Sequence, residues 1–220
     1  MPLRNDNPEE DLRQVQIAVM AKAPIPGLAK TRLIPALGRR GAARLQRQLT
    51  RIAVQTALDA RLGAVTLWCT PDVEHGFFKA LRQNTGVDCR RQPDGDLGER
   101  MHAAFRLHCQ QGPSLLIGTD CPALGAAHLR AAARALVEGD DAVFCPAEDG
   151  GYVLVGLRHP QQALFSGMTW STPNVMAATR ARARSQNLRI FESETLWDID
   201  EPADLPRLRR LGVKMPIQRT

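Results

Sequence analysis

Short apolar segments with the length of buried strands alternate along this chain with segments whose apolar residues recur at helical spacing. Leu45, Leu49 and Ile52 begin one such helical series. The pattern predicts helices near 45–60, 77–81, 97–109, 126–137, 173–183 and 202–211, and strands at 15–21, 64–69, 114–117, 142–145, 152–157 and 188–191. Strands that alternate with helices form βαβ units, whose parallel sheet is covered by helices on both faces. We therefore expect an α/β fold with a mostly parallel central sheet.

The length of 220 residues fits one large domain. The sequence contains no internal repeat and no linker rich in Gly, Pro or Ser. We expect a loose polar tail at 1–13, a single domain at 14–213 and a second tail at 214–220.

The net charge of +6, from 29 Lys and Arg against 23 Asp and Glu, favours acidic small molecules, nucleic acid or membrane surfaces as partners. No apolar run approaches the length of a membrane span, and the N-terminal segment is acidic rather than apolar, so we expect neither a membrane anchor nor a secretory signal. The five cysteines are well separated and form no CxxC pair. They are typical of reduced thiols and predict a cytoplasmic protein.

Ligands of such sheets bind beyond the carboxyl ends of the strands, so the loops that follow strands are the place to look for chemistry. The loop at 22–33 carries Lys22, Lys30 and Arg32 together with two prolines and Gly27. Phosphate oxygens would use both these charges and any exposed backbone N–H groups. The alternative is a solvated basic turn, since the loop matches neither a Walker A motif nor a GxGxxG motif.

Acidic residues follow two of the expected strands. Asp120 comes directly after 114–117, where a carboxylate could hold Mg²⁺ against a diphosphate, or could cap the next helix or turn. Asp198 and Asp200 project to the same side of an extended segment. Either a metal ion or the N-terminus of the following helix could compensate their charges.

Three further segments each have a structural and a functional interpretation. Asp149 in the turn at 146–152 offers a proton acceptor near two glycines that allow close approach of a ligand, although Asp-Gly is also a common turn pair. The glycines at 94–101 suit a base or phosphate at a helix N-terminus, whereas Asp96 and Glu99 form an adequate capping box. Trp170 could stack on a ring, or merely precede a capped helix.

Six motifs, taken together and in order, make the sequence similar to a known family. They are MAKAPIPGLAKTRL, GDLGERM, LIGTDCPAL, PAEDGGYVLVGL, WSTPNV and WDIDEPADL. They resemble the bacterial transferase family associated with radical-SAM and selenodomain proteins, some members of which are described as arsenosugar-biosynthesis glycosyltransferases. The resemblance covers about residues 15 to 211. It implies the nucleotide-diphospho-sugar transferase superfamily, with a single-domain Rossmann-like GT-A fold, and a relationship to 2-phospholactate guanylyltransferase.

The resemblance also implies roles for particular positions. The nucleotide would be bound by Lys22, Gly27 and Thr31, with Gly95, Leu97, Gly98 and Arg100 near the base and ribose. Asp120 and Asp200 would hold Mg²⁺ (or Mn²⁺), with Asp198 as a further candidate. The sugar or acceptor would face Gly150, Gly151, Trp170, Ser171 and Thr172. Two departures are that a Pro-Gly basic loop replaces the GxGTR-type loop of the pyrophosphorylases, and that Gly118-Thr119-Asp120 supplies one acid where glycosyltransferases have DxD.

The leading hypothesis is a Mg²⁺-dependent glycosyltransferase acting on a nucleotide sugar, with Lys30 and Arg32 stabilising charge. Asp149 would accept the proton of the attacking hydroxyl if the reaction inverts the configuration of the sugar. The alternative is a nucleotidyltransferase that couples an NTP to a phosphate or carboxylate acceptor with release of pyrophosphate. Both imply a nucleotide and a small-molecule acceptor as partners, with no nucleic acid and no membrane. A nucleic-acid-binding module is disfavoured by the acidic loops and the absence of an RNA-binding signature.

Overall fold

A computed structural model describes residues 8–213 and places seven strands in one sheet. The strands are β1 (Gln16–Lys22), β2 (Val65–Thr70), β3 (Asp88–Arg91), β4 (Ser114–Ile117), β5 (Ala142–Pro146), β6 (Tyr152–Leu157) and β7 (Ile190–Glu192). The helices are α1 (Pro8–Leu12), α2 (Ile34–Asp59), α3 (Gly76–Thr85), α4 (Leu97–His108), α5 (Ala126–Glu138), α6 (Val175–Ser185) and α7 (Leu205–Arg210). Short 3₁₀ turns lie at η1 (Thr31–Leu33), η2 (Gln162–Leu164) and η3 (Pro202–Asp204).

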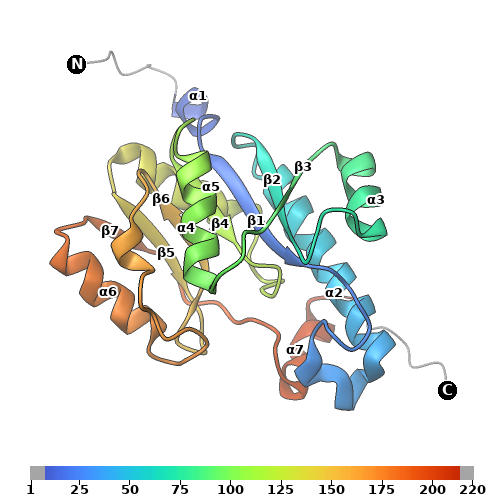
Figure 1. The fold of residues 1–220 in the computed structure, drawn as a ribbon. Helices are drawn as coiled ribbons and strands as arrows, with labels where there is room; N and C mark the ends of the chain where they lie inside the picture. Colours follow the sequence, from blue (N-terminus) through green and yellow to red (C-terminus); the bar gives the residue numbers. More distant parts are fainter. Residues whose placement is uncertain (1–7, 214–220) are drawn as a thin grey trace.

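The strand order is β3-β2-β1-β4-β6-β5-β7 (Figure 1). The pairs β1–β2, β1–β4, β2–β3 and β5–β7 are parallel, whereas β6 runs antiparallel to both β4 and β5. The expected α/β fold with a mostly parallel sheet is therefore confirmed. Because β1, β2 and β4 point the same way, their following loops meet at one edge of the sheet.

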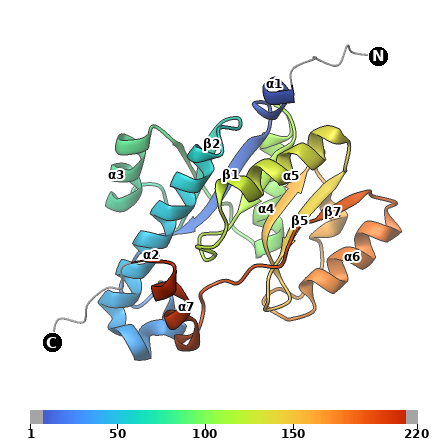
Figure 2. The ribbon, with the colours of Figure 1, turned by 180° about the vertical axis from the view of Figure 1, so that it is seen from behind.

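Helices cover both faces of the sheet, which explains why the strands are apolar on both sides. Along β1, Ile17 and Val19 enter one hydrophobic core with side chains of α2, α3 and α5, while Ala18 enters the other core with side chains of α4 and α6. Figure 2 shows α2 and α5 in front of the sheet, on the face opposite α4. Alternate residues of a strand point to opposite faces, so burial on both sides requires a nearly continuous apolar run.

A third cluster joins the start of α2 to the C-terminal part of the described chain. Leu33, Leu37 and Leu45 from η1 and α2 pack against Ile199, Leu205 and Leu208 around α7. This packing holds the loop after β1 beside the loop at 197–201, although they are separated by more than 160 residues of sequence. It is the tertiary contact that brings the predicted basic loop to the predicted acidic loop.

Two local predictions differ from the structure. Residues 8–12, expected within a loose tail, form α1, whose Leu12 is buried and whose Glu9 accepts hydrogen bonds from Arg130 of α5 at 2.6 and 2.8 Å. Strand β3 was not predicted, because it is a mostly exposed edge strand with a polar sequence. Residues 1–7 and 214–220 of the predicted tails lie outside the described residues. None of the described helices combines the length and apolar character needed to cross a membrane.

Candidate functional site

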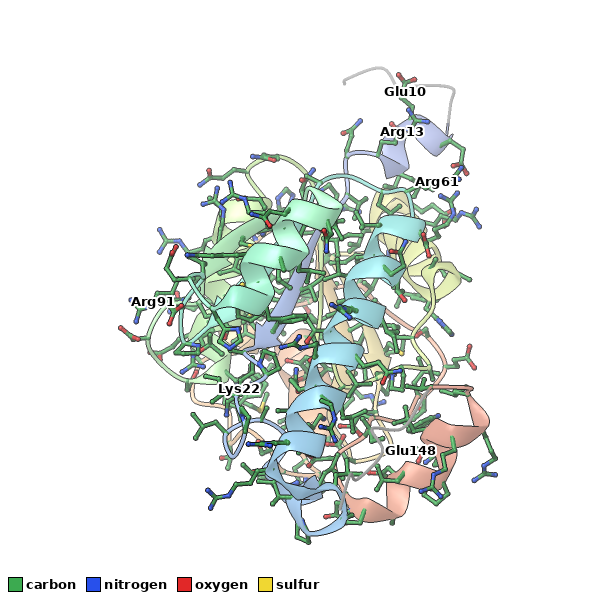
Figure 3. The ribbon with its side chains drawn as sticks, turned by 90° about the vertical axis from the view of Figure 1, so that its right-hand side faces the viewer. Glu10, Arg13, Lys22, Arg61, Arg91 and Glu148 are labelled. Carbon is green, nitrogen blue, oxygen red and sulfur yellow. The ribbon has the colours of Figure 1, made fainter. Side chains whose placement is uncertain are left out.

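A cavity of about 580 Å³ opens where the loops after β1, β4 and β5 meet the loop at 197–201. Figure 3 shows Lys22 and Glu148 at this end of the molecule, and Glu10, Arg13 and Arg61 at the other end. The predicted site residues that line the cavity are Lys22, Lys30, Thr31, Arg32, Leu97, Asp120, Asp149, Gly151, Trp170, Ser171, Thr172, Asp198 and Asp200. Gly27, Gly95, Gly98, Arg100 and Gly150 do not line it.

Lys30 is the cation at the base of the cavity, and its side chain is only 4% exposed. Its Nζ lies 2.9 Å from Asp120 Oδ1 and donates to the carbonyl of Ile199. The residue adopts a left-handed backbone conformation at the start of η1, with φ of 48°. Lys30 thus connects the first loop, the end of β4 and the C-terminal loop, and its ammonium is held in place before any substrate arrives.

The other two predicted cations differ in their partners. Arg32 donates to Asp200 across the mouth of the cavity, and both side chains remain well exposed. Lys22 ends β1 and is exposed at the cavity rim. Among the described residues it forms no ion pair, so its charge is available to an anionic ligand.

The acidic side of the cavity contains a carboxyl group with a shifted pKa. Burial, together with the nearby carboxylates of Asp149 and Asp120, raises the pKa of Asp198 to about 6, while Lys30 opposes this rise. Within residues 8–213, however, no three His, Cys, Asp or Glu side chains are close enough to hold a metal ion by themselves. The donor set therefore suits a hard cation that takes one or two carboxylates and completes its shell with phosphate oxygens and water.

The structure also separates the two adjacent acids of the turn at 146–152. Glu148 accepts two hydrogen bonds from Arg207 of α7, at 2.6 and 2.8 Å, and this pairing lowers the pKa of its carboxyl group. The guanidinium of Arg207 also lies over the ring of Trp197, 4.5 Å from its centroid. Asp149 instead lines the cavity and accepts a hydrogen bond from the backbone N–H of Gly151 at 2.9 Å. Glu148 has a structural partner, and Asp149 faces the site.

The segment at 94–101 forms the capping box that the sequence suggested as an alternative. Asp96 accepts from the backbone N–H of Glu99 at 2.9 Å, and Glu99 accepts from the backbone N–H of Asp96 at 2.8 Å. Arg100 donates to the carbonyl of Gly95 and so points away from the cavity lining. Leu97 is the residue of this segment that reaches the cavity, with 45% of its surface exposed.

Gly98 allows α4 to approach the wall that carries Trp170. A Cβ atom at Gly98 would lie 2.8 Å from the carbonyl oxygen of Phe165 and 2.8 Å from Cζ2 of Trp170. Distances this short are not tolerated, so a side chain at this position must displace the indole. The role of Gly98 visible in the structure is therefore to make room for a neighbouring cavity residue.

We expect Gly98→Ala to lower the free energy of unfolding by about 1–3 kcal/mol, as overpacked sites commonly do. Within a helix, alanine is more favourable than glycine by up to about 1 kcal/mol. A lower free energy of unfolding for Gly98→Ala would therefore show that the steric clash outweighs this gain in helix propensity. Thermal unfolding measured by calorimetry tests this. Gly76→Ala in the first turn of α3, where no atom lies within 4 Å of the added Cβ, is the control and should not destabilise. Equal melting temperatures for Gly98→Ala and the wild type would contradict the prediction.

The Trp170 wall is secured by an arginine that the sequence did not single out. Arg182 of α6 donates to the carbonyls of Ala163, Leu164, Ser166 and Gly167 at 2.7–3.4 Å. These bonds fix the chain between η2 and the cavity, and in the turn that follows Ser171 has a φ of 60°.

The thiol of Cys121, beside Asp120, is not suited to act as a nucleophile. Burial raises its pKa to about 12, so that the thiol remains protonated.

Several further residues line the cavity that the sequence did not indicate, some within strands and helices and others in loops. Gln92 follows β3 and donates from Nε2 to the carbonyls of Ala21 and Trp68, which leaves its Oε1 as an acceptor. Tyr152 and Trp170 each bury a polar atom without a partner among the described residues. The remaining lining residues not predicted include Met20, Leu28, Gln46, Thr70, Gly118, Thr119, Cys121, Ala147, Val153 and Val175.

Part of the sequence matches one known protein family. The model of the DUF2064 family, described as an uncharacterized protein conserved in bacteria, matches residues 53–172. The chain belongs to this family. No curated protein sequence matches this DUF2064 chain significantly.

Several solved structures resemble this DUF2064 protein over nearly its whole length. A proposed nucleotide-diphospho-sugar transferase from Desulfovibrio desulfuricans G20 is 27% identical, with a TM-score of 0.82, and the match covers 94% of this chain and 91% of that one. The 4-diphosphocytidyl-2C-methyl-D-erythritol synthase of Anaerococcus prevotii DSM 20548 is 11% identical, with a TM-score of 0.61 over 93% and 99% of the chains. The inositol-1-phosphate CTP transferase of T. maritima is 10% identical, with a TM-score of 0.59 over 96% and 98%. The fold is that of the nucleotide-diphospho-sugar transferases, and these structural neighbours are transferases.

Proposed function

We propose that this protein is a transferase that uses a nucleotide-activated donor and a divalent cation, and that its reaction is glycosyl transfer from a nucleotide sugar. The observation that carries the proposal is the arrangement of charge in one cavity. Lys22 ends β1, Lys30 and Arg32 follow it in the next loop, and Asp120, Asp149 and Asp198 come from the facing loops. A nucleoside diphosphate with its cation needs this combination of fixed positive charge and hard oxygen ligands.

The acidic residues fit a divalent cation because Asp198 is crowded by two other carboxylates in a half-buried position. Asp120 and Asp200 are the ligands that the motif pattern implies, with Asp198 as the further candidate. Asp120 and Asp200 each pair with a cation through one oxygen, and Asp198 lies close enough to Asp120 and Asp149 to interact with their charges, so all three remain proposed ligands. When bound, Mg²⁺ or Mn²⁺ would supply charge neutralisation for the leaving diphosphate.

The chain's own residues have separate tasks in this proposal. Lys30 holds its ammonium rigidly beside Asp120, and Arg32 adds a second charge at the mouth, so both would stabilise negative charge that develops on phosphate oxygens. Arg207 pairs with Glu148 rather than with Asp149, so Asp149 would be available to accept the proton of the attacking hydroxyl. Nucleotide binding is proposed for Lys22, Thr31 and Leu97, with Gly27, Gly95, Gly98 and Arg100 acting outside the cavity lining through backbone shape.

The acceptor or sugar is proposed to lie against Gly151, Trp170, Ser171 and Thr172. The buried, unpartnered polar atoms of Trp170 and Tyr152 support a polar group at this wall. Gly150 lies next to this wall, and only glycine fits there, because a Cβ atom would lie 2.1 Å from the carbonyl oxygen of Pro173. We also propose that the protein belongs with the transferases associated with radical-SAM and selenodomain proteins, because the six motifs occur in the same order. We propose a cytoplasmic setting, because the five cysteines are free thiols.

Nucleotidyl transfer is the second candidate. Two of the structural neighbours carry names of cytidine-nucleotide chemistry, one as a 4-diphosphocytidyl-2C-methyl-D-erythritol synthase and the other as an inositol-1-phosphate CTP transferase. Three cations in one loop also suit a triphosphate. In that reaction an acceptor phosphate or carboxylate attacks the α-phosphate of an NTP, and pyrophosphate leaves.

One experiment separates the two reactions. The protein is incubated with each common NTP or nucleotide sugar, together with Mg²⁺ and a panel of sugar, phosphate and carboxylate acceptors. Release of a nucleoside diphosphate from a sugar donor supports glycosyl transfer, whereas release of pyrophosphate from an NTP overturns it in favour of the second candidate. The same compounds with and without Mg²⁺ in thermal-shift assays report binding, since a ligand of the folded state raises the melting temperature. No metal-dependent shift with any of them would contradict both.

A further inference from the structure

We propose that Gln46 and Thr119 are positioning residues that fix one oxygen of Asp120 and so leave its other oxygen to bind the divalent cation. The inference rests on the proposed function, because it concerns the ligand that we assign to Asp120. Neither residue is part of a loop motif. Gln46 lies within α2, and Thr119 is the buried residue between the exposed Gly118 and Asp120.

The observation is a buried chain of hydrogen bonds that ends on Asp120. Gln46 is 4% exposed, and its Nε2 lies 3.0 Å from Thr119 Oγ1 and 3.3 Å from Thr50 Oγ1. Thr119 is 6% exposed, and its Oγ1 lies 3.2 Å from Asp120 Oδ1. The chain therefore runs from the interior of α2 to the end of β4 without crossing solvent.

The directions of these bonds follow from what each group can donate. An amide nitrogen only donates, so both threonine oxygens accept from Gln46. The Thr50 hydroxyl gives its own proton to the backbone carbonyl of Gln46 at 2.9 Å. The Thr119 hydroxyl has one proton, and the carboxylate of Asp120 is its acceptor. Each polar hydrogen in the chain thus has one acceptor, and the network allows a single orientation of the Thr119 hydroxyl.

The same carboxylate oxygen also receives the charge of Lys30. Asp120 Oδ1 lies 2.9 Å from Lys30 Nζ, so this one atom is bound by both the hydroxyl and the ammonium. In the part of the chain that the structure describes, Oδ2 accepts no hydrogen bond, and the Asp120 side chain is 47% exposed at the cavity. Oδ2 is therefore the oxygen left for a cation.

Fixing Oδ1 matters because a carboxyl group rotates easily. The last torsion of an aspartate is broad, so an aspartate held at one oxygen by a single partner can turn both oxygens away from a ligand. Two partners at Oδ1 restrict that rotation. Groups that orient a metal ligand in this way commonly contribute 10- to 100-fold to metal affinity.

The test measures Mn²⁺ binding to the purified protein by electron paramagnetic resonance of the free ion, with no substrate present. Thr119→Val keeps the shape of the side chain and removes the hydroxyl, and we expect it to raise the Kd for Mn²⁺ about tenfold or more. Thr119→Ser keeps the hydroxyl and should restore the wild-type value. Gln46→Met frees the Thr119 hydroxyl from its donor and should give an intermediate loss, which also provides a second readout should Thr119→Val fold poorly.

Thr50→Val is the matched control, because it removes the other hydroxyl bound to Gln46 but leaves the bond from Thr119 to Asp120 in place. We expect it to change the melting temperature as much as Thr119→Val does, with Mn²⁺ affinity unchanged. Equal Mn²⁺ affinity for Thr119→Val and the wild type would overturn the inference alone, as would an equal loss in Thr50→Val. A wild-type protein that binds no Mn²⁺ would overturn the proposed metal chemistry and this inference with it.

Discussion

Replacing Asp120 with Asn is expected to lower the rate of the transfer reaction by about two to three orders of magnitude, the usual effect of removing one group that stabilises transition-state charge. Asn has nearly the same shape and can still accept from Thr119, so the chain should still fold, with some loss of stability because the buried Lys30 ammonium loses its counter-charge. It lacks the negative charge that would hold a divalent cation and that balances Lys30, 2.9 Å away. The measurement is the rate of nucleoside diphosphate or pyrophosphate release with the donor that proves active.

Asp59→Asn is the control for the change of charge. Asp59 ends α2, far along the chain from the cavity loops, and accepts a hydrogen bond from Gln55 at 2.8 Å that asparagine can also accept. This variant should keep wild-type turnover and Mn²⁺ affinity. An Asp120→Asn protein that turns over and binds Mn²⁺ as the wild type does would show that Asp120 is not a ligand of the reacting complex.

Strand β4 shows when the sequence alone suffices to place an element. Its four residues, Ser114–Ile117, are all buried, so they form an apolar run that no helix pattern explains. Strand β3 is the opposite case. Asp88–Arg91 holds the edge of the sheet with three exposed side chains, and neither its composition nor its periodicity differs from those of a polar loop. Only its pairing with β2, formed after folding, makes it a strand.

Helix α1 depends in a similar way on distant contacts. Its first turn contains Glu9, Glu10 and Asp11, which alone suggest a solvated tail. The buried side chain of Leu12 and the pairing of Glu9 with Arg130, 121 residues away, hold it against α5. Local sequence patterns cannot indicate such a partner, and so the boundary between tail and domain was set too far into the chain.

The candidate site was predictable to the extent that it follows the ends of strands. That Asp120 and Lys30 lie in one cavity follows from the sequence pattern, because parallel strands bring their following loops to one edge. The choice between Glu148 and Asp149 was not predictable, since it depends on Arg207 from α7 reaching across to Glu148. Gln46 was also hidden, because a glutamine within a long helix has the same sequence signature as a solvated surface residue.

Lys30→Met gives the second large effect, and it tests whether the buried ammonium serves both the fold and the ligand. Methionine fills a similar volume without charge, which leaves Asp120 Oδ1 without its cation and the carbonyl of Ile199 without its donor. Hydrogen bonds to charged groups contribute about 1.5–3 kcal/mol, so the free energy of unfolding should fall by about that amount. Loss of a fixed cation at the phosphate site should also weaken nucleotide binding about tenfold or more, which is about 1.4 kcal/mol.

Chemical unfolding measures the first effect, and a titration with UDP, CDP, ADP and GDP in the presence of Mg²⁺ measures the second. Lys79→Met is the control, because Lys79 is 55% exposed and pairs with the exposed Glu74, an arrangement that contributes little to stability. Lys22→Met adds a comparison within the site. Since the Lys22 side chain is exposed at the rim and forms no ion pair within residues 8–213, this variant should bind nucleotide more weakly without being destabilised. If Lys30→Met is as stable as Lys79→Met and binds nucleotide as the wild type does, Lys30 is neither the structural link between the loops nor a phosphate ligand.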